Sequence, residues 1–190
     1  MKRTPEDFLR LLEPVYPKLA RFSLAITRDS ELAKDLTSDT VLAALERFET
    51  MRDTEHFAGF LFTIASRLHK RRKYRDRFRI PYDRSSAENH VDTNPTPDQA
   101  AEIAIVMQAL EKLPSKLKET VVLFEIADLS LEEIRRIQGG TLSGVKTRLS
   151  RGREQLRKHL GIENNSSPIE EGAAQQHLVR SLTSGESYAI

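Results

Sequence analysis

The chain has 190 residues, with 30 Lys and Arg against 28 Asp and Glu, a net charge of +2, and no cysteine. This length suits one ordinary domain or two small ones, and the lack of cysteine excludes disulfides, thiolate zinc sites and a cysteine nucleophile. No apolar run approaches the roughly 20 residues that span a bilayer, and the first residues show no signal-peptide core, so we expect a cytoplasmic protein without membrane insertion.

The first 80 residues carry the periodicity of helices. Thr4 is suited to cap a helix that opens at Pro5, and apolar residues then recur at helical spacing as far as Ile26. Pro14 and Pro17 must kink or divide that stretch. A second helix is predicted from about residue 30 to 48 and a third from about 55 to 74. The third has the clearest apolar stripe, formed by Phe57, Phe60, Leu61, Ile64, Ala65 and Leu68.

The second half reads as a proline-rich linker followed by more helices. Residues 81–97 hold three prolines among small polar residues, which favours a flexible tether. Helices are predicted after Pro97, after Pro114, from a Ser130–Glu133 capping box to Gly139, and from a Ser143 cap to Leu160. We therefore predict an all-α protein with two small helical domains, 1–80 and 98–160, a linker over 81–97, and a tail, 161–190, that is disordered or regulatory.

The near-neutral total charge hides two basic blocks. Residues 67–80 carry 8 basic and 1 acidic side chains, and residues 130–160 carry 8 and 3. The other segments are acidic, with net charges of −2 for 1–66, −5 for 81–129 and −3 for 161–190. Two separated basic blocks are typical of a protein that contacts a polyanion at two points, although either block alone is also compatible with a solvated helix face.

Residues 130–153 have the pattern of a helix-turn-helix, whose second helix enters the major groove of DNA. Val145, Leu149 and Leu156 give that helix an apolar side. Cations there can neutralise phosphates or grip guanine, whereas the alternative is a basic amphipathic helix on an ordinary bundle. The predicted duplex-DNA contacts are Lys146, Thr147, Arg148, Ser150, Arg151 and Arg153.

The first basic block differs in kind, because its cations surround the helix end instead of forming one face. Nearby aromatic rings, Phe57, Phe60, Phe62 and Tyr74, could stack on unpaired bases, as proteins that bind single strands do. The alternative is that Phe57 and Phe60, which lie on the apolar stripe, are buried. The predicted single-strand contacts are Phe57, Phe60, Arg67, Lys70 and Arg71.

Five motifs in order carry a family resemblance. ELAKDLTSDT at 31–40 resembles "ELAEDLVQET", and FAGFLFTIA at 57–65 resembles "FRAWLYRIA". ALEKLP at 109–114, LSLEEI at 129–134 and VKTRLSRGR at 145–153 resemble "ALARLP", "LSYEEI" and "VKSRLSRAR". The span from about residue 8 to 160 thus resembles a bacterial sigma factor of the extracytoplasmic-function (ECF) group, with an N-terminal region 2 and a C-terminal region 4.

The resemblance implies partners and roles. Region 2 would bind the clamp of core RNA polymerase through Asp35, Ser38 and Asp39, and the melted minus-ten element through the single-strand contacts given above. The loop from Glu49 to His56 would capture a flipped base. Region 4 would bind the minus-thirty-five element of promoter DNA, and an anti-sigma factor would hold the protein inactive. No cofactor, metal site or catalytic residue is expected.

The chain departs from the family pattern at several of these positions. Ser38-Asp39 replaces Gln-Glu, Phe60 replaces Trp, and Ser66-Arg67 replaces Arg-Asn. The helix-turn-helix turn is also richer in glycine. Two other functions stay open: a helix-turn-helix regulator that acts without polymerase, and a sigma mimic that titrates an anti-sigma factor. The usual mimics carry a fused receiver domain, and none fits in this length.

Overall fold

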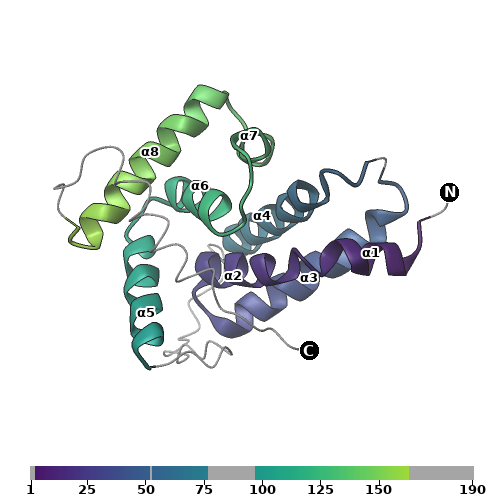
Figure 1. Cartoon of the computed structure of the whole chain (residues 1–190), viewed down its shortest axis with the longest axis horizontal. Coiled ribbons are helices and arrows are strands. Elements are labelled where there is room, and N and C mark those ends of the chain that lie inside the picture. Colours follow the sequence, from purple (N-terminus) through teal and green to yellow (C-terminus); the bar gives the residue numbers. More distant parts are fainter. Residues whose placement is uncertain (1–2, 52, 77–96, 163–190) are drawn as a thin grey trace.

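The computed structural model describes residues 3–51, 53–76 and 97–162, and within them every regular element is a helix. The predicted all-α class is therefore confirmed. The predicted linker, apart from Pro97, and the predicted tail beyond Ile162 lie outside the described residues. Figure 1 shows the helices, which are α1 (Pro5–Leu12), α2 (Tyr16–Thr27), α3 (Ser30–Phe48), α4 (Phe57–Asp76), α5 (Pro97–Glu111), α6 (Ser115–Glu125), α7 (Leu131–Gln138) and α8 (Leu142–His159).

The N-terminal boundaries follow from caps and prolines. Thr4 and Asp7 form a reciprocal capping box at α1, with Pro5 at the first helical position. The prolines divide the first predicted helix into α1 and α2. Asp29 caps α3 by accepting a hydrogen bond from the Leu32 amide at 2.8 Å. The preceding residue, Arg28, takes a left-handed conformation with φ of 58°, which turns the chain between α2 and α3.

The boundaries of α7 and α8 are set by one capping box and two glycines. The Ser130–Glu133 box at α7 is present as predicted. Gly139 and Gly140 have φ of 75° and 88°, a region that favours glycine, and they end α7. The predicted Ser143 cap of α8 is wrong. Because the chain has already turned at the glycines, Thr141 is extended and accepts a hydrogen bond from the Gly144 amide at 3.1 Å.

Each half of the chain supplies its own buried side chains. In α1–α4, the rings of Phe8, Phe48 and Phe57 meet edge to face, as do those of Phe22 and Phe62. Edge-to-face pairs stabilise a core by about 0.5–1.5 kcal/mol beyond area burial. From α5 to α8 the large buried apolar side chains are aliphatic and include Leu110, Leu113, Val121, Val122, Leu123, Ile134, Val145 and Leu149.

The two halves also lie against each other. Figure 1 shows α6 and α7 beside α2 and α4, so that the helix-turn-helix is held next to the N-terminal bundle. Gly59 of α4 lies at one close approach, where a Cβ would come 3.0 Å from Glu133 Oε1 of α7. Polar contacts between the halves engage some of the basic side chains of α4, such as Lys70, and leave others exposed.

Candidate polymerase and nucleic-acid interface

The second helix of the helix-turn-helix, α8, has a divided surface. Val145 and Leu149 are buried, as is Gly152, so this side of α8 faces the core. Four side chains point away from it and are exposed, and we call them the recognition face: Lys146, Thr147, Ser150 and Arg151. Two cations and two short hydroxyls on one exposed helical face can bind phosphates and reach base edges.

Two arginines predicted to contact DNA are engaged within the protein instead. Arg148 donates from Nε to Gln138 Oε1 at 3.1 Å and from Nη2 to the Gly139 carbonyl at 3.3 Å, which ties α8 to the end of α7. Arg153 donates to Glu125 Oε1 at 2.7 Å, and its guanidinium lies 4.9 Å from the centre of the Phe124 ring. Both side chains therefore fix the angle of α8.

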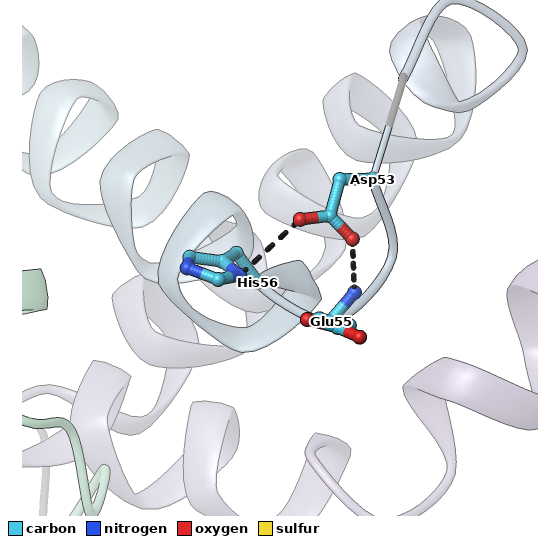
Figure 2. Close-up of side chains that lie close together, drawn as sticks. All are labelled: Asp53, Glu55 and His56. Carbon is cyan, nitrogen blue, oxygen red and sulfur yellow. Dashed lines mark hydrogen bonds and ion pairs between the residues drawn. The ribbon is translucent and has the colours of Figure 1, made fainter.

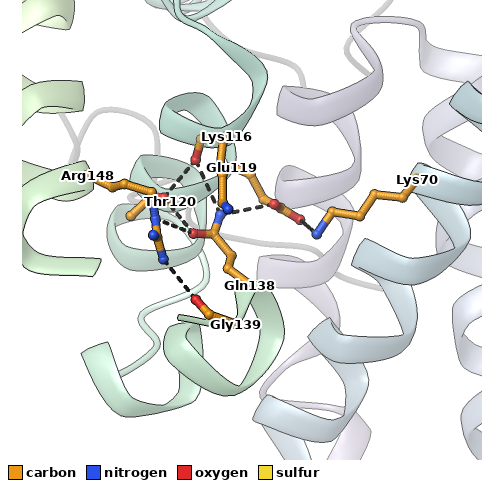
Figure 3. Close-up of polar contacts among 7 residues, drawn as sticks. All are labelled: Lys70, Lys116, Glu119, Thr120, Gln138, Gly139 and Arg148. Atoms are coloured by element: carbon orange, nitrogen blue, oxygen red, sulfur yellow. Dashed lines mark hydrogen bonds and ion pairs between the residues drawn. The ribbon is translucent and has the colours of Figure 1, made fainter. Parts of the chain in front are cut away.

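Gln138 is the centre of this polar network, which Figure 3 shows. Its Oε1 accepts from Arg148 and, at 2.8 Å, from the Thr120 hydroxyl. Its Nε2 donates to Glu119 Oε2 at 3.0 Å and to the Lys116 carbonyl. Glu119 in turn pairs with Lys70 Nζ of α4 at 3.0 Å. A chain of contacts thus runs from the recognition helix to the N-terminal half.

The cations of the first basic block are unequally engaged. Arg67 and Arg71 are exposed on α4 and make no ion pair or hydrogen bond with the described part of the chain. By contrast, Lys70 pairs with Glu119, and Arg72 pairs with Asp39 of α3 at 2.5 Å. Lys73 donates to the Ser115 hydroxyl of α6 at 2.8 Å. The C-terminal half thus engages Lys70 and Lys73, while Arg67 and Arg71 stay available.

The aromatic rings of α4 lie mostly inside the bundle. Phe57 is only 3% exposed and packs on Phe8 and Phe48, so it lies among the core rings and not among the exposed basic side chains of the predicted minus-ten surface. Phe62 is likewise buried against Phe22. Phe60 is partly buried, with its ring centre 6.5 Å from that of Phe57. Of the predicted stackers on α4, Phe60 is partly exposed, and Tyr74, near the end of the helix, is 63% exposed.

The loop before α4 brings together three side chains that sequence reasoning did not group. Figure 2 shows Asp53, Glu55 and His56, whose possible ligand atoms all lie within 4.8 Å of one another. Asp53 accepts from the Glu55 amide at 2.8 Å and lies 3.4 Å from His56 Nδ1. These local contacts account for the proximity, and all three side chains are exposed. The sequence signal that could have predicted this cluster is that Asp53, Glu55 and His56 lie within four consecutive residues.

The three predicted polymerase contacts share one exposed face of α3. Asp35, Ser38 and Asp39 are all exposed, in keeping with their spacing of three and four residues. Two large apolar side chains continue the same stripe: Leu42 is 58% exposed and Leu45 is 40% exposed. The spacing of Leu42 and Leu45 from Asp35 and Asp39 places them on this face of α3. The sequence prediction named only the polar residues of the face. We call these five residues the α3 face.

Two ionisable groups between the halves have shifted pKa values. Burial, assisted by Lys73, lowers the pKa of His69 to about 4, so this imidazole is neutral at physiological pH. Burial also lowers the pKa of Lys118 to about 8, and the nearby cations Arg28 and Lys73 act in the same direction. Both shifts indicate that added positive charge is unfavourable where α4 meets α6.

Comparisons with known proteins agree with this architecture. The family model for Sigma-70 region 2 matches residues 11–79, and that for Sigma-70 region 4 matches residues 103–156. The ECF RNA polymerase sigma factor EcfG of Rhodopseudomonas palustris is 28% identical over 77% of this chain and 81% of its own. RNA polymerase sigma factor YlaC of Bacillus subtilis is 30% identical over 79% of this chain and 90% of its own.

A solved structure of similar fold is the sigma factor RpoE from Bartonella quintana, in complex with the anti-sigma factor NepR. It aligns with a TM-score of 0.64 and 23% identity, covering 84% of this chain and 99% of that one. The chain belongs to the ECF group of bacterial RNA polymerase sigma factors, proteins that direct the initiation of transcription. In the part that the structure describes, no helix is both long and apolar enough to cross a membrane.

Proposed function

We propose that this sigma factor divides promoter recognition between two domains, 1–80 and 98–160, joined by a linker over 81–97. Region 4 would position the complex on the duplex minus-thirty-five element, and region 2 would trap the melted minus-ten strand. Core polymerase would hold both at the separation of the two elements, so that each raises the effective concentration of the other. The observation that carries this proposal is that the chain exposes two separate basic surfaces, the recognition face of α8 and the cations of α4.

The recognition face would read the minus-thirty-five element. Arg151 has the donors to grip a guanine edge or a phosphate, and Lys146 adds a point charge. Thr147 and Ser150 are short enough to let α8 lie deep in the groove. Arg148 and Arg153, which were grouped with them from the sequence, are better explained as positioning residues because their donors are directed at Gln138, Gly139 and Glu125.

The α3 face would bind the polymerase clamp. Asp35, Ser38 and Asp39 supply acceptors for cations, and Leu42 and Leu45 supply apolar area that is otherwise exposed to water. An apolar centre beside charged groups is typical of protein–protein interfaces.

The minus-ten surface would consist of Arg67, Lys70 and Arg71 on α4, together with Phe60 and the loop from Glu49 to His56 that precedes the same helix. Cations would track the backbone of the single strand, and the loop would hold a flipped base, whose extraction costs a few kcal/mol. The burial of Phe57 and Phe62 leaves Phe60 and Tyr74 as the better candidates for stacking.

The same reasoning gives further proposals about partners. An anti-sigma factor is a proposed partner because the sigma factor of the similar Bartonella structure is bound to one. The chain would act in the cytoplasm and by binding alone, without catalysing a reaction. The two other functions raised by the sequence, a regulator acting without polymerase and a sigma mimic, explain region 2 less well, since that region matches the family over residues 11–79.

The test is promoter-specific transcription. Purified core polymerase and this chain should initiate at discrete sites in a genome-wide promoter pool, and Arg151→Ala should reduce that initiation. Lys158→Ala is the matched control, because Lys158 is an exposed cation near the end of the same helix. Binding to duplex DNA without any polymerase-dependent initiation would favour the regulator, and binding to anti-sigma factors alone would favour the mimic.

A further inference from the structure

Among the described residues, three ion pairs join the two halves of the protein, and in all three the cation and the anion come from the same respective halves. Lys18 pairs with Asp128 at 3.0 Å, Arg28 pairs with Glu111, and Lys70 pairs with Glu119 at 3.0 Å. In each pair the cation belongs to region 2 and the anion to region 4. Region 4 binds DNA through its basic recognition face, yet it presents acid to region 2. We call Glu111, Glu119 and Asp128 the bridging acids.

The region 2 surface that receives these acids is strongly positive. Lys73 extends it by donating to Ser115. Lys118, a region 4 cation that reaches the same surface, has its pKa lowered to about 8 by burial and then by Arg28 and Lys73. A surface that accepts three carboxylates and disfavours an added cation has the electrostatics of a site for polyanions.

Glu119 is the most constrained of the bridging acids. It is buried, 7% exposed, and it accepts both from Lys70 and from Gln138. A buried carboxylate needs such partners, because an unpaired charge away from water is costly. While Lys70 satisfies Glu119, its ammonium is directed at region 4. Glu119 therefore takes up one donor and offsets the charge of Lys70 in this arrangement, which weakens its attraction for the promoter strand.

The backbone at two of these contacts supports a role beyond the local fold. Arg28 and Asp128 both have positive φ, 58° and 57°, in a region that disfavours residues other than glycine, asparagine and aspartate. Arg28 caps the end of α2, where glycine would be the unstrained choice, whereas Asp128 is of a residue type that tolerates this region. Both place a charged side chain in an ion pair with the other half.

We propose that the bridging acids of region 4 occupy the basic surface of region 2 in place of nucleic acid, so that the free chain holds itself closed and competes with single-stranded promoter DNA for Lys70 and its neighbours. This inference rests on the proposed DNA-binding role of the α4 basic surface. Region 4 thus acts as an intramolecular phosphate mimic. Separation of the regions would free Lys70 and Lys73 of α4 for the promoter strand.

The test uses the full chain and measures closure and DNA binding separately. The chain has no cysteine, so Glu46→Cys and Lys158→Cys provide specific dye positions on α3 and α8 for energy transfer. The opening variant is Glu111→Gln/Glu119→Gln/Asp128→Asn, which keeps side-chain shape and removes three charges. The control is Glu102→Gln/Glu132→Gln/Glu154→Gln, which removes three region 4 charges that make no ion pair with the described residues of region 2.

We expect the opening variant to lose energy transfer and to bind a labelled 20-nucleotide mixed-sequence single strand at least about fivefold more tightly at 100 mM salt, since each pair contributes modestly. The control should change affinity less than about twofold. Unchanged energy transfer, or an equal gain in the control, would overturn the proposal. Loss of energy transfer without tighter binding would show that the bridging acids hold the chain closed but do not compete with single-stranded DNA, which would overturn that part of the proposal.

A second variant keeps the proposal testable if the first one folds poorly. Arg28→Gly/Asp128→Gly removes two ion pairs and relieves the backbone strain at Arg28, so it should open the chain with little loss of melting temperature. Retention of full energy transfer in this variant would contradict the proposal. Neither energy-transfer readout depends on polymerase, so failure of promoter-specific transcription would count against the proposed function and not against closure.

Discussion

Gly152 of α8 gives the most quantitative test of how the recognition helix is seated. A Cβ at this position would lie 2.6 Å from Val121 Cγ2 and 3.4 Å from the Leu117 carbonyl oxygen of α6. Carbon atoms make unstrained contacts at about 3.5–4.0 Å, so Gly152→Ala must push the two helices apart by roughly 1 Å or distort Val121. Val121 is buried and β-branched, which leaves it little freedom to move.

Two effects of opposite sign decide the outcome. Overpacking in a close-packed site costs about 1–3 kcal/mol, whereas alanine is favoured over glycine in a helix by about 0.8–1.0 kcal/mol. Gly152→Ala should therefore lower the free energy of unfolding by up to about 2 kcal/mol. In a Val121→Ala background the clash is absent, so the same substitution should stabilise the protein by about 1 kcal/mol.

The assay is urea denaturation of four proteins: the parent, each single variant and the double variant, with Ser150→Ala as an exposed control on the same helix. A double-mutant cycle isolates the interaction between positions 121 and 152. If Gly152→Ala has the same effect in both backgrounds, the close approach of α6 and α8 is not what requires glycine here.

Two further predictions concern α7 and the contact between the halves. Ser130→Ala removes the cap that accepts from the Glu133 amide at 3.2 Å, and should cost about 1 kcal/mol in urea denaturation, with exposed Ser143→Ala as control. Closure should weaken as pH falls from 6.5 towards 4. The pKa of His69, which faces Lys70 and Lys73 of α4 and Lys118 and Glu119 of α6, is about 4 in this structure. An uncovered imidazole protonates near 6.5, so acid favours the open form. Energy transfer should fall between pH 6.5 and 5, and His69→Gln should flatten that slope; an unchanged slope would exclude His69 as the cause.

Local signals in the sequence predicted the helices well. The prolines at 14, 17, 97 and 114, the Thr4 and Ser130 capping boxes and the glycines at 139 and 140 all mark boundaries that the structure has. The Thr141 cap was missed because serine is a somewhat better N-cap than threonine, so the sequence alone favours Ser143. The choice between them depends on where the backbone leaves its left-handed turn.

The sequence predicted which residues of the site are exposed on α8, but it did not predict which arginines are held by partners within the protein. Periodicity placed Lys146, Ser150 and Arg151 on an exposed face of α8, and the structure has them there. It could not tell that Arg148 and Arg153 are engaged by Gln138 and Glu125, because those partners lie 10 and 28 residues away. The burial of Phe57 depends on Phe8 and Phe48, which come from other helices.

The ion pair between Arg72 and Asp39 has a consequence for the order of events at a promoter. It joins the helix proposed to meet polymerase to the helix proposed to meet DNA. A polymerase cation that takes Asp39 would release the Arg72 guanidinium beside the DNA strand, and DNA that takes Arg72 would release Asp39. Such linkage is reciprocal by thermodynamic necessity. One surface ion pair contributes at most about 1 kcal/mol, so each ligand would strengthen the other up to about fivefold. Assembly on polymerase would then favour promoter capture even before any larger rearrangement of the chain.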